Sequence, residues 1–220
     1  MVTKISIENY TTVNYTYDTT ITLPNKNDYP SSQELSLFQC KNELNTILEK
    51  SKAQKTVRFE EDDWVYAYYF DGTNDFAYFS GGKDGYWNEK WYGKLGSNYV
   101  YFKKYTTLNG TQKTYDIISE STIDNYIENV NDEIFQYLEY DLIDFLGEAI
   151  YFAGYKSVAD ATTYYIEAAD GYVTREFTVT VVDGLLTDIV LIEDGDPCAS
   201  ATYDYSTPIT LPNINEYTLN

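Results

Sequence analysis

The 220-residue sequence contains no histidine, and this absence excludes several kinds of chemistry. Without histidine there is no Ser-His-Asp triad, no imidazole general base and no histidine ligand for zinc. Only two cysteines are present, Cys40 and Cys198, and neither belongs to a Cys-x-x-Cys pair. They either form a disulfide or remain isolated buried thiols, and we favour isolated thiols. We therefore expect a non-enzymatic protein with no catalytic residues, no metal site and no cofactor.

Basic residues are also scarce, with 15 Lys and Arg against 35 Asp and Glu, which gives a net charge of −20. A surface this acidic repels phosphate backbones, so we expect no nucleic-acid partner. No apolar run approaches the roughly 18 residues that a membrane helix needs, so we expect no membrane insertion. The chain also begins without the apolar stretch of a signal peptide. We interpret it as a processed or excised segment of an extracellular or cell-surface bacterial protein.

Aromatic residues are abundant instead, with 25 Tyr, 10 Phe and 3 Trp. They crowd a series of short strand patterns between residues 55 and 118. Aromatic side chains favour strands and pair across them, so one interpretation is simple sheet packing. Alternatively, they line a cavity for a hydrophobic small molecule, or form a platform for a glycan or a protein partner. The candidate ligand-binding residues are Trp64, Tyr86, Trp87, Trp91, Tyr99 and Tyr101.

A segment near the end of the sequence repeats a segment near its beginning. Residues 14–29 and residues 202–217 are identical at ten of sixteen positions, at a constant offset of 188. A repeat of this length is typical of a domain array. We predict that residues 1–29 are the last strands of a preceding unit plus a linker, that residues 30–213 form one complete unit, and that residues 214–220 begin the next linker. Residues 3–24 have the pattern of two strands joined by a turn, and residues 3–25 then become candidates for strand exchange between chains.

Local patterns predict two helical regions and many strands. Ser31 and Glu34 have the spacing of a capping box, which places a helix from Ser32 to Lys50 with Leu37 and Phe38 on its apolar stripe. A second helical region, in two pieces, is expected from Ser121 to Gly147. The apolar stripes of both regions should be buried against the sheet, including Leu44, Ile47, Leu48, Ile134, Leu138 and Leu142. The run Glu60–Asp63 is expected to be a solvated turn or bulge rather than a calcium site. The predicted strands are 56–60, 64–70, 76–79, 86–92, 99–105, 112–118, 163–168, 172–182, 185–192 and 201–211.

Short connections with Asp-Gly and Asn-Gly turns join most of these strands, so the sheet should be antiparallel. Helices segregated from a large antiparallel sheet define an α+β fold. The closing stretch Arg175–Ile189 has the form strand, Asp-Gly, strand. Together with the order of elements over residues 31–213, it resembles the LolA-like superfamily of lipoprotein carriers, which includes the LppX/LprG-type lipoproteins. This resemblance implies a curved half-barrel with helices packed on one face, and an apolar cavity between them.

These observations lead to one expected function and two alternatives. The expected function is that of a non-catalytic repeat domain on a bacterial cell surface, acting in binding or presentation. The first alternative is a carrier of a hydrophobic ligand such as a lipid. The second is a glycan-binding module that uses the aromatic strands. The orientation of the aromatic side chains separates these hypotheses, and we expect them to point inward into a largely filled core.

Overall fold

The computed structural model describes residues 4–5, 13–14, 32–70, 76–82, 88–107 and 110–220. The chain divides into two compact units, Met1–Ser31 and Ser32–Asn220. In the first unit, β1 (Lys4–Ile5) pairs antiparallel with β2 (Val13–Asn14), within the region where two strands are predicted. The second unit contains every other described helix and strand.

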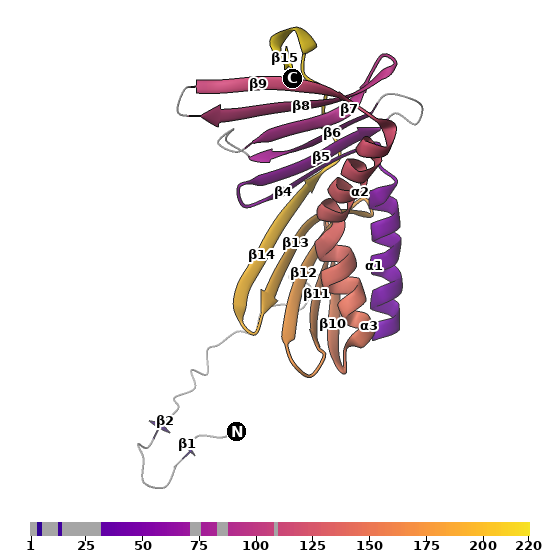
Figure 1. Cartoon of the computed structure of the whole chain (residues 1–220). Coiled ribbons are helices and arrows are strands. Elements are labelled where there is room, and N and C mark those ends of the chain that lie inside the picture. Colours follow the sequence, from indigo (N-terminus) through magenta and orange to yellow (C-terminus); the bar gives the residue numbers. More distant parts are fainter. Residues whose placement is uncertain (1–3, 6–12, 15–31, 71–75, 83–87, 108–109) are drawn as a thin grey trace. The chain divides into compact units, whose positions relative to one another are not determined.

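The second unit is built on a single sheet of thirteen described strands (Figure 1). Neighbouring strands are antiparallel, except that β15 runs parallel to β9. The strand order is β15-β9-β8-β7-β6-β5-β4-β14-β13-β12-β11-β10-β3. The bounds are β3 Ser32–Leu35, β4 Thr56–Glu61, β5 Trp64–Phe70, β6 Phe76–Gly82, β7 Glu89–Leu95, β8 Asn98–Thr107, β9 Gly110–Ile118, β10 Tyr151–Val158, β11 Thr162–Ala169, β12 Thr174–Val182, β13 Leu185–Glu193, β14 Asp196–Asp204 and β15 Thr218–Leu219.

The sheet is curved, and the strands β4–β9 run in a different direction from β10–β14 (Figure 1). Helix α1 packs against β10 and β13, whereas helix α2 packs against β5, β6 and β7. Figure 1 shows both helices along the same face of the sheet. The predicted α+β fold, with a curved antiparallel sheet and helices on one face, is confirmed.

Helix α1 (Leu37–Lys52) begins later than predicted. Its capping box uses Ser36 and Gln39: the Ser36 hydroxyl accepts from the Gln39 amide at 3.3 Å, and the Gln39 side chain accepts from the Ser36 amide at 3.1 Å. The predicted box at Ser31 and Glu34 is wrong. Residues Ser32–Leu35 form β3 instead, because they pair with the open edge of β10. Tertiary pairing here overrides a local capping signal.

The buried stripe of α1 is nevertheless close to the predicted one. Phe38 was expected on this stripe, but it is 75% exposed because it lies off the buried row. The predicted burial of six helical residues is confirmed: Leu44, Ile47, Leu48, Ile134, Leu138 and Leu142.

The second helical region is continuous rather than broken in two. Helix α2 (Glu120–Gln136) passes into a π-helical segment (Tyr137–Asp144) and then into α3 (Phe145–Glu148). At its start, the Ser119 hydroxyl accepts from the amide of Thr122 at 3.3 Å. The wider π-helical turn changes the direction of the following side chains, and all three segments contain buried apolar residues.

Two-residue turns join β12 to β13 and β13 to β14. The first, at Asp183-Gly184, is as predicted, whereas a longer turn is expected from the sequence over Asp194–Pro197. Asp183 and Gly184 have φ values of 54° and 76°, and Asp194 and Gly195 have values of 50° and 88°. Two consecutive left-handed residues give the turn that suits a twisted hairpin. The acidic run also behaves as expected, since its first half ends β4 and Asp62, with φ of 44°, begins the turn to β5.

Three further predictions need correction. Strands β3 and β10 were not predicted, and β14 ends at Asp204 rather than at residue 211. The strand ends there because the Asp204 carboxylate accepts hydrogen bonds from the amide and hydroxyl of Ser206, which turns the chain. Cys198 lies in β14 and is exposed, whereas Cys40 is buried, and both thiols are free.

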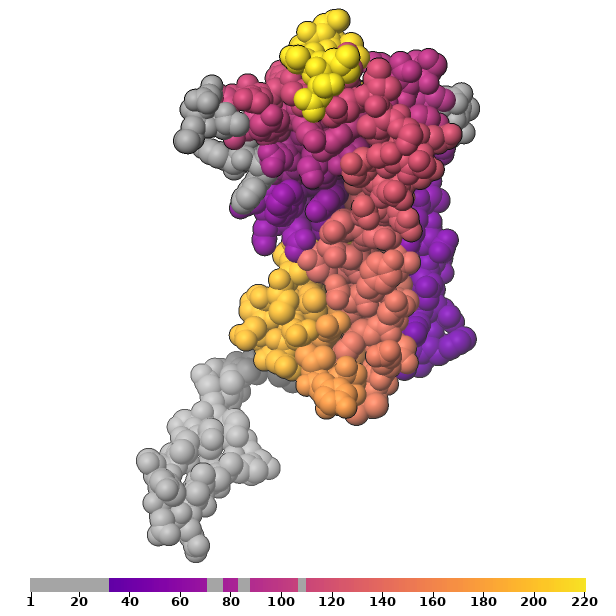
Figure 2. Space-filling model, viewed as in Figure 1, coloured from indigo at the N-terminus to yellow at the C-terminus, as the bar shows by residue number. Residues whose placement is uncertain are grey.

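After β14 the chain continues as a tail, residues 205–220, which returns to the far end of the same sheet. It contains a 3₁₀ turn at Ile214–Glu216 and ends in β15, where Thr218 lies opposite Thr114 of β9. Figure 2 shows the last residues lying over the end of the sheet that β8 and β9 form. Residues 214–220, predicted as the start of a linker, are therefore part of the second unit.

Candidate functional site

Two rows of aromatic residues cross the strands β5–β8 on opposite faces. Side chains alternate between the faces of a strand, so residues adjacent in sequence point in opposite directions. The inner row faces α2 and consists of directly opposed tyrosines, Tyr68, Tyr78, Tyr92 and Tyr101. The outer row faces away from the helices and consists of Ala67, Phe79, Trp91 and Phe102.

The inner row packs tightly against α2. The rings of Tyr92 and Tyr101 stack at 4.8 Å, and Tyr126 of α2 stacks on Tyr92 at 4.2 Å. Burial raises the pKa of Tyr78 to about 12, and burial is also the largest cause that raises the pKa of Tyr101 to about 12. These phenols remain neutral at physiological pH. Their role is to hold α2 against the sheet.

A groove of about 560 Å³ runs between α2 and the inner face of β5–β7. Its aromatic part contains Trp64, which is 40% exposed and stacks on Tyr66 with 6.4 Å between ring centroids. The rest of its lining is mostly polar. It consists of Ser80, Asn88, Lys90 and Tyr92 from the strands and of Tyr126, Asn129, Val130, Asp132 and Glu133 from α2.

Carboxylates are concentrated at this groove. Glu133 has a raised pKa because of burial and of the nearby charges of Glu61 and Asp132. Tyr137 donates a hydrogen bond to Glu61, and Gln136 donates one to Glu133 at 3.3 Å. The pKa of Tyr66 is raised by burial and then by the charges of Glu133 and Glu61. Like charges held together in a groove cost stability, and such places are often binding sites.

We predict that Glu133→Gln stabilises the protein at neutral pH. A carboxyl group whose pKa is raised in the folded state stabilises the fold when protonated, and this contribution is lost as the pH rises through the folded-state pKa. The gain at pH 7 should be below about 1 kcal/mol, because Glu133 is only partly buried and solvent screens its neighbours. It should vanish as the pH falls to about 3, where the wild-type carboxyl is protonated in both states.

Urea unfolding at several pH values measures this effect. Glu128→Gln is the matched control, since Glu128 is exposed on the same helix. It should change the free energy of unfolding by less than about 0.5 kcal/mol. A Glu133→Gln variant that is less stable than wild type at pH 7 would contradict this prediction. It would show that the Glu133 carboxylate has a favourable partner, and Lys90 in the same groove would be the candidate.

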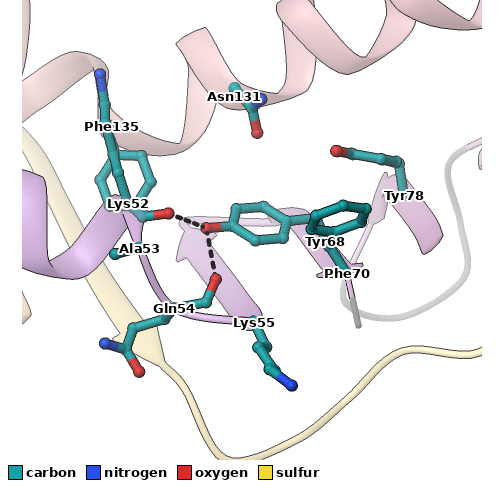
Figure 3. A pocket seen from close by; sticks show the side chains of 9 residues that line it. All are labelled: Lys52, Ala53, Gln54, Lys55, Tyr68, Phe70, Tyr78, Asn131 and Phe135. Atoms are coloured by element: carbon teal, nitrogen blue, oxygen red, sulfur yellow. Dashed lines mark hydrogen bonds between the residues drawn. The ribbon is translucent and has the colours of Figure 1, made fainter. Parts of the chain in front are cut away.

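A second groove, of about 570 Å³, lies where the end of α1 meets β5, β6 and α2 (Figure 3). Its walls are mainly apolar and include the rings of Tyr68, Phe70 and Phe135. The Tyr68 hydroxyl donates to the carbonyl oxygens of Lys52 at 3.1 Å and Gln54 at 3.2 Å. With its phenol satisfied by the backbone, Tyr68 presents its ring to the groove. This arrangement suits an apolar ligand.

The four predicted ligand-binding residues that the structure describes do not lie together in one site. Trp64 lines the groove beside α2, and Tyr101 is buried in the inner row. Tyr99 donates a hydrogen bond to Glu120 at 2.6 Å, whereas Trp91 lies on the outer face beside Phe79, with ring centroids 5.1 Å apart. Tyr86 and Trp87 lie outside the described residues.

Sequence reasoning missed the contribution of α2 to the groove. Asn129, Asp132 and Glu133 lie on the helix surface beside its buried stripe, where polar residues are ordinarily solvated. Only the packing of α2 against β5–β7 shows that they face Trp64 and Tyr66. A cluster of amide and carboxylate side chains within one helical turn was the signal available in the sequence.

Comparison with known proteins does not assign this chain to a family. A scan against protein-family models and a search of curated proteins found no match to this chain. Within the described ranges, no group of three His, Cys, Asp or Glu residues is arranged to hold a metal ion. None of the helices described is both long and apolar enough to cross a membrane.

Proposed function

We propose that this protein is a non-catalytic binding domain that takes a carbohydrate in the groove beside α2. The observation that carries the proposal is the partly exposed Trp64, stacked on Tyr66 at the wall of a groove whose lining also includes two amides and two carboxylates. A sugar ring has an apolar C–H face and an edge of hydroxyl groups. Aromatic rings match the face, and Asn129, Asp132 and Asn88 match the hydroxyls as hydrogen-bond donors and acceptors.

The mutual repulsion of the carboxylates near this groove supports the same proposal. Glu61, Asp132 and Glu133 repel one another in the free protein, as the raised pKa of Glu133 indicates. Sugar hydroxyls that donate hydrogen bonds to Asp132 and Glu133, the two carboxylates in the lining, relieve part of that cost on binding. The acidic composition and the duplicated tail support placement of the domain in a repeat-containing surface or secreted bacterial protein.

Fluorescence titration with soluble oligosaccharides tests the proposal. The probes are short chito-, cello-, malto-, manno- and galacto-oligosaccharides. We expect at least one to bind, and Trp64→Ala to weaken that binding by about tenfold or more, as expected for a central aromatic contact. Chromatography of the incubated sugars should show no shorter products.

Trp91→Phe is the matched control, because Trp91 lies in β7, which also lines the groove, but its side chain is on the opposite face of the sheet. It should bind the oligosaccharide as the wild type does. If no oligosaccharide binds, or if Trp64→Ala binds unchanged, the groove beside α2 is not a carbohydrate site. If shorter sugars appear and Glu133→Gln abolishes them, the domain is an enzyme and the non-catalytic part of the proposal fails.

A hydrophobic-ligand carrier is the second candidate, and the apolar groove at the end of α1 favours it (Figure 3). This candidate accords with the resemblance to LolA-like carriers. It predicts that a fatty acid or phospholipid binds between Phe70 and Phe135 and that Phe70→Ser weakens this binding. Phe70 is 44% exposed, so this substitution should leave the fold intact. Lipid binding that depends on Phe70 and not on Trp64 would select the carrier over the carbohydrate module.

A further inference from the structure

The outer face of β5–β8 is covered by the protein's own tail. Val65, Ala67 and Phe79 form a small buried cluster on this face, and Trp91 and Ile209 pack against it. Ile209 comes from the tail, more than one hundred residues later in the sequence than the strands it contacts. The tail therefore completes a second, minor core on the side of the sheet away from the helices.

Two further tail residues anchor this contact. Tyr217 meets the fully buried Phe102 edge-on, with 5.0 Å between ring centroids. Glu216 pairs with Lys113 of β9 at 3.0 Å, and the same lysine lies over the Tyr217 ring at 5.5 Å. The tail holds this course because Asn213 accepts from the amide of Asn215 at 3.1 Å and so starts the 3₁₀ turn.

The anchoring residues occur a second time in the sequence, at an offset of 188. Over residues 209–217, seven of nine positions are identical in residues 21–29, including Ile21 for Ile209 and Tyr29 for Tyr217. Asp28 replaces Glu216 and keeps the carboxylate that pairs with Lys113. The remaining difference, Lys26 for Ile214, falls within the 3₁₀ turn. The duplicated residues thus include those whose side chains contact the outer face.

We propose that residues 21–29 of a second copy of this chain bind the outer face of β5–β8 in place of residues 209–217, and so join copies head to tail. The match of side chains carries this proposal: an isoleucine for the Val65, Ala67 and Phe79 cluster, a tyrosine for Phe102 and a carboxylate for Lys113. It does not depend on the groove beside α2, which lies on the other face of the sheet.

The two segments compete on unequal terms. The tail is tethered to the surface it covers, which gives it an effective concentration of the order of millimolar. Residues 21–29 of another molecule can bind in two circumstances. Either the concentration of the chain exceeds this effective concentration, or the tail has already been displaced from the outer face. Beyond residue 29 the likeness ends, because Pro30 and Ser31 stand where Thr218 and Leu219 form β15. Proline has no amide to donate, so the exchanged segment should end before β15.

The test uses full-length chains that differ only in these contacts. In the first variant, Ile209→Asp and Tyr217→Ala weaken the protein's own tail. In the second, Ile21→Asp and Tyr29→Ala are added. Sedimentation velocity should show a monomeric wild type, concentration-dependent oligomers of the first variant, and a monomeric second variant. A fluorescent peptide of residues 19–31 should bind the second variant at least about tenfold more tightly than the wild type, and a scrambled peptide should not bind.

Two results would overturn the proposal. One is a folded first variant that stays monomeric while the second variant does not bind the peptide. The other is that both variants oligomerise alike, because exposed apolar surface rather than residues 21–29 would then cause association. If Ile209→Asp prevents folding, Tyr217→Ala alone in the full chain is titrated with the same peptide. Failure of that variant to bind more peptide than wild type also rejects the proposal.

Discussion

Leu138→Ala should lower the free energy of unfolding by about 2–5 kcal/mol, the range for a large apolar side chain removed from a packed core. Leu138 is fully buried in the π-helical segment, and that segment packs against both α1 and β13. It therefore lies where the two helical layers and the sheet meet. Neighbouring core side chains come from three separate elements, so they cannot all move to fill the space left by the deletion.

Urea denaturation of wild type and variant measures this loss. Tyr140→Ala is the matched control, because Tyr140 lies in the same π-helical segment and is 49% exposed. Its free energy of unfolding should change by less than about 0.5 kcal/mol. A loss below about 1 kcal/mol for Leu138→Ala would contradict the packing described for this segment.

The second large effect is expected at Ser51, the buried polar residue at the end of α1. Its hydroxyl accepts a hydrogen bond from the amide of Leu186 at 3.1 Å. The pairing of β12 with β13 shifts register between Thr180 and Val181, beside Leu186. The Ser51 hydroxyl therefore accepts a hydrogen bond from a backbone amide that lies next to an irregularity in the sheet.

Ser51→Ala removes this acceptor and leaves the Leu186 amide buried without a partner. We expect a loss of about 1–3 kcal/mol, the cost of an unsatisfied buried donor. Hydrogen exchange gives a local readout, since the Leu186 amide should exchange faster in the variant. Thr46→Ala, which removes an exposed hydroxyl from the same helix, should leave both quantities unchanged. Unaltered exchange at Leu186 in Ser51→Ala would show that the amide finds another acceptor.

Part of the candidate site could be read from the sequence and part could not. Trp64 was identified because it begins a strand rich in aromatic residues. Trp91 was identified because it lies in another strand pattern rich in aromatic residues, yet it lies on the opposite face from the groove. The alternation of a strand shows that Trp91 and Tyr92 point apart. It does not show which of them meets the helices, because both faces of this sheet are covered.

The sequence by itself determined the features that depend on local chemistry. The absence of histidine excluded whole classes of site, the three- and four-residue spacing of leucines and isoleucines identified the buried helix faces, and Asp-Gly pairs marked the hairpins. Each of these follows from a few neighbouring residues and does not need a partner elsewhere.

Only the tertiary structure decided the features that need a distant partner. Ser32–Leu35 is a strand because β10 offers an edge, despite a helical capping pattern. Residues 205–211 leave the strand predicted for them, and residues 209–217 cover the outer face, where Tyr217 contacts Phe102 and Glu216 pairs with Lys113. The groove beside α2 joins β5 to a helix more than fifty residues away in the chain. Strand pairing and face-to-face packing release free energy only when both surfaces are present, so no local pattern encodes them.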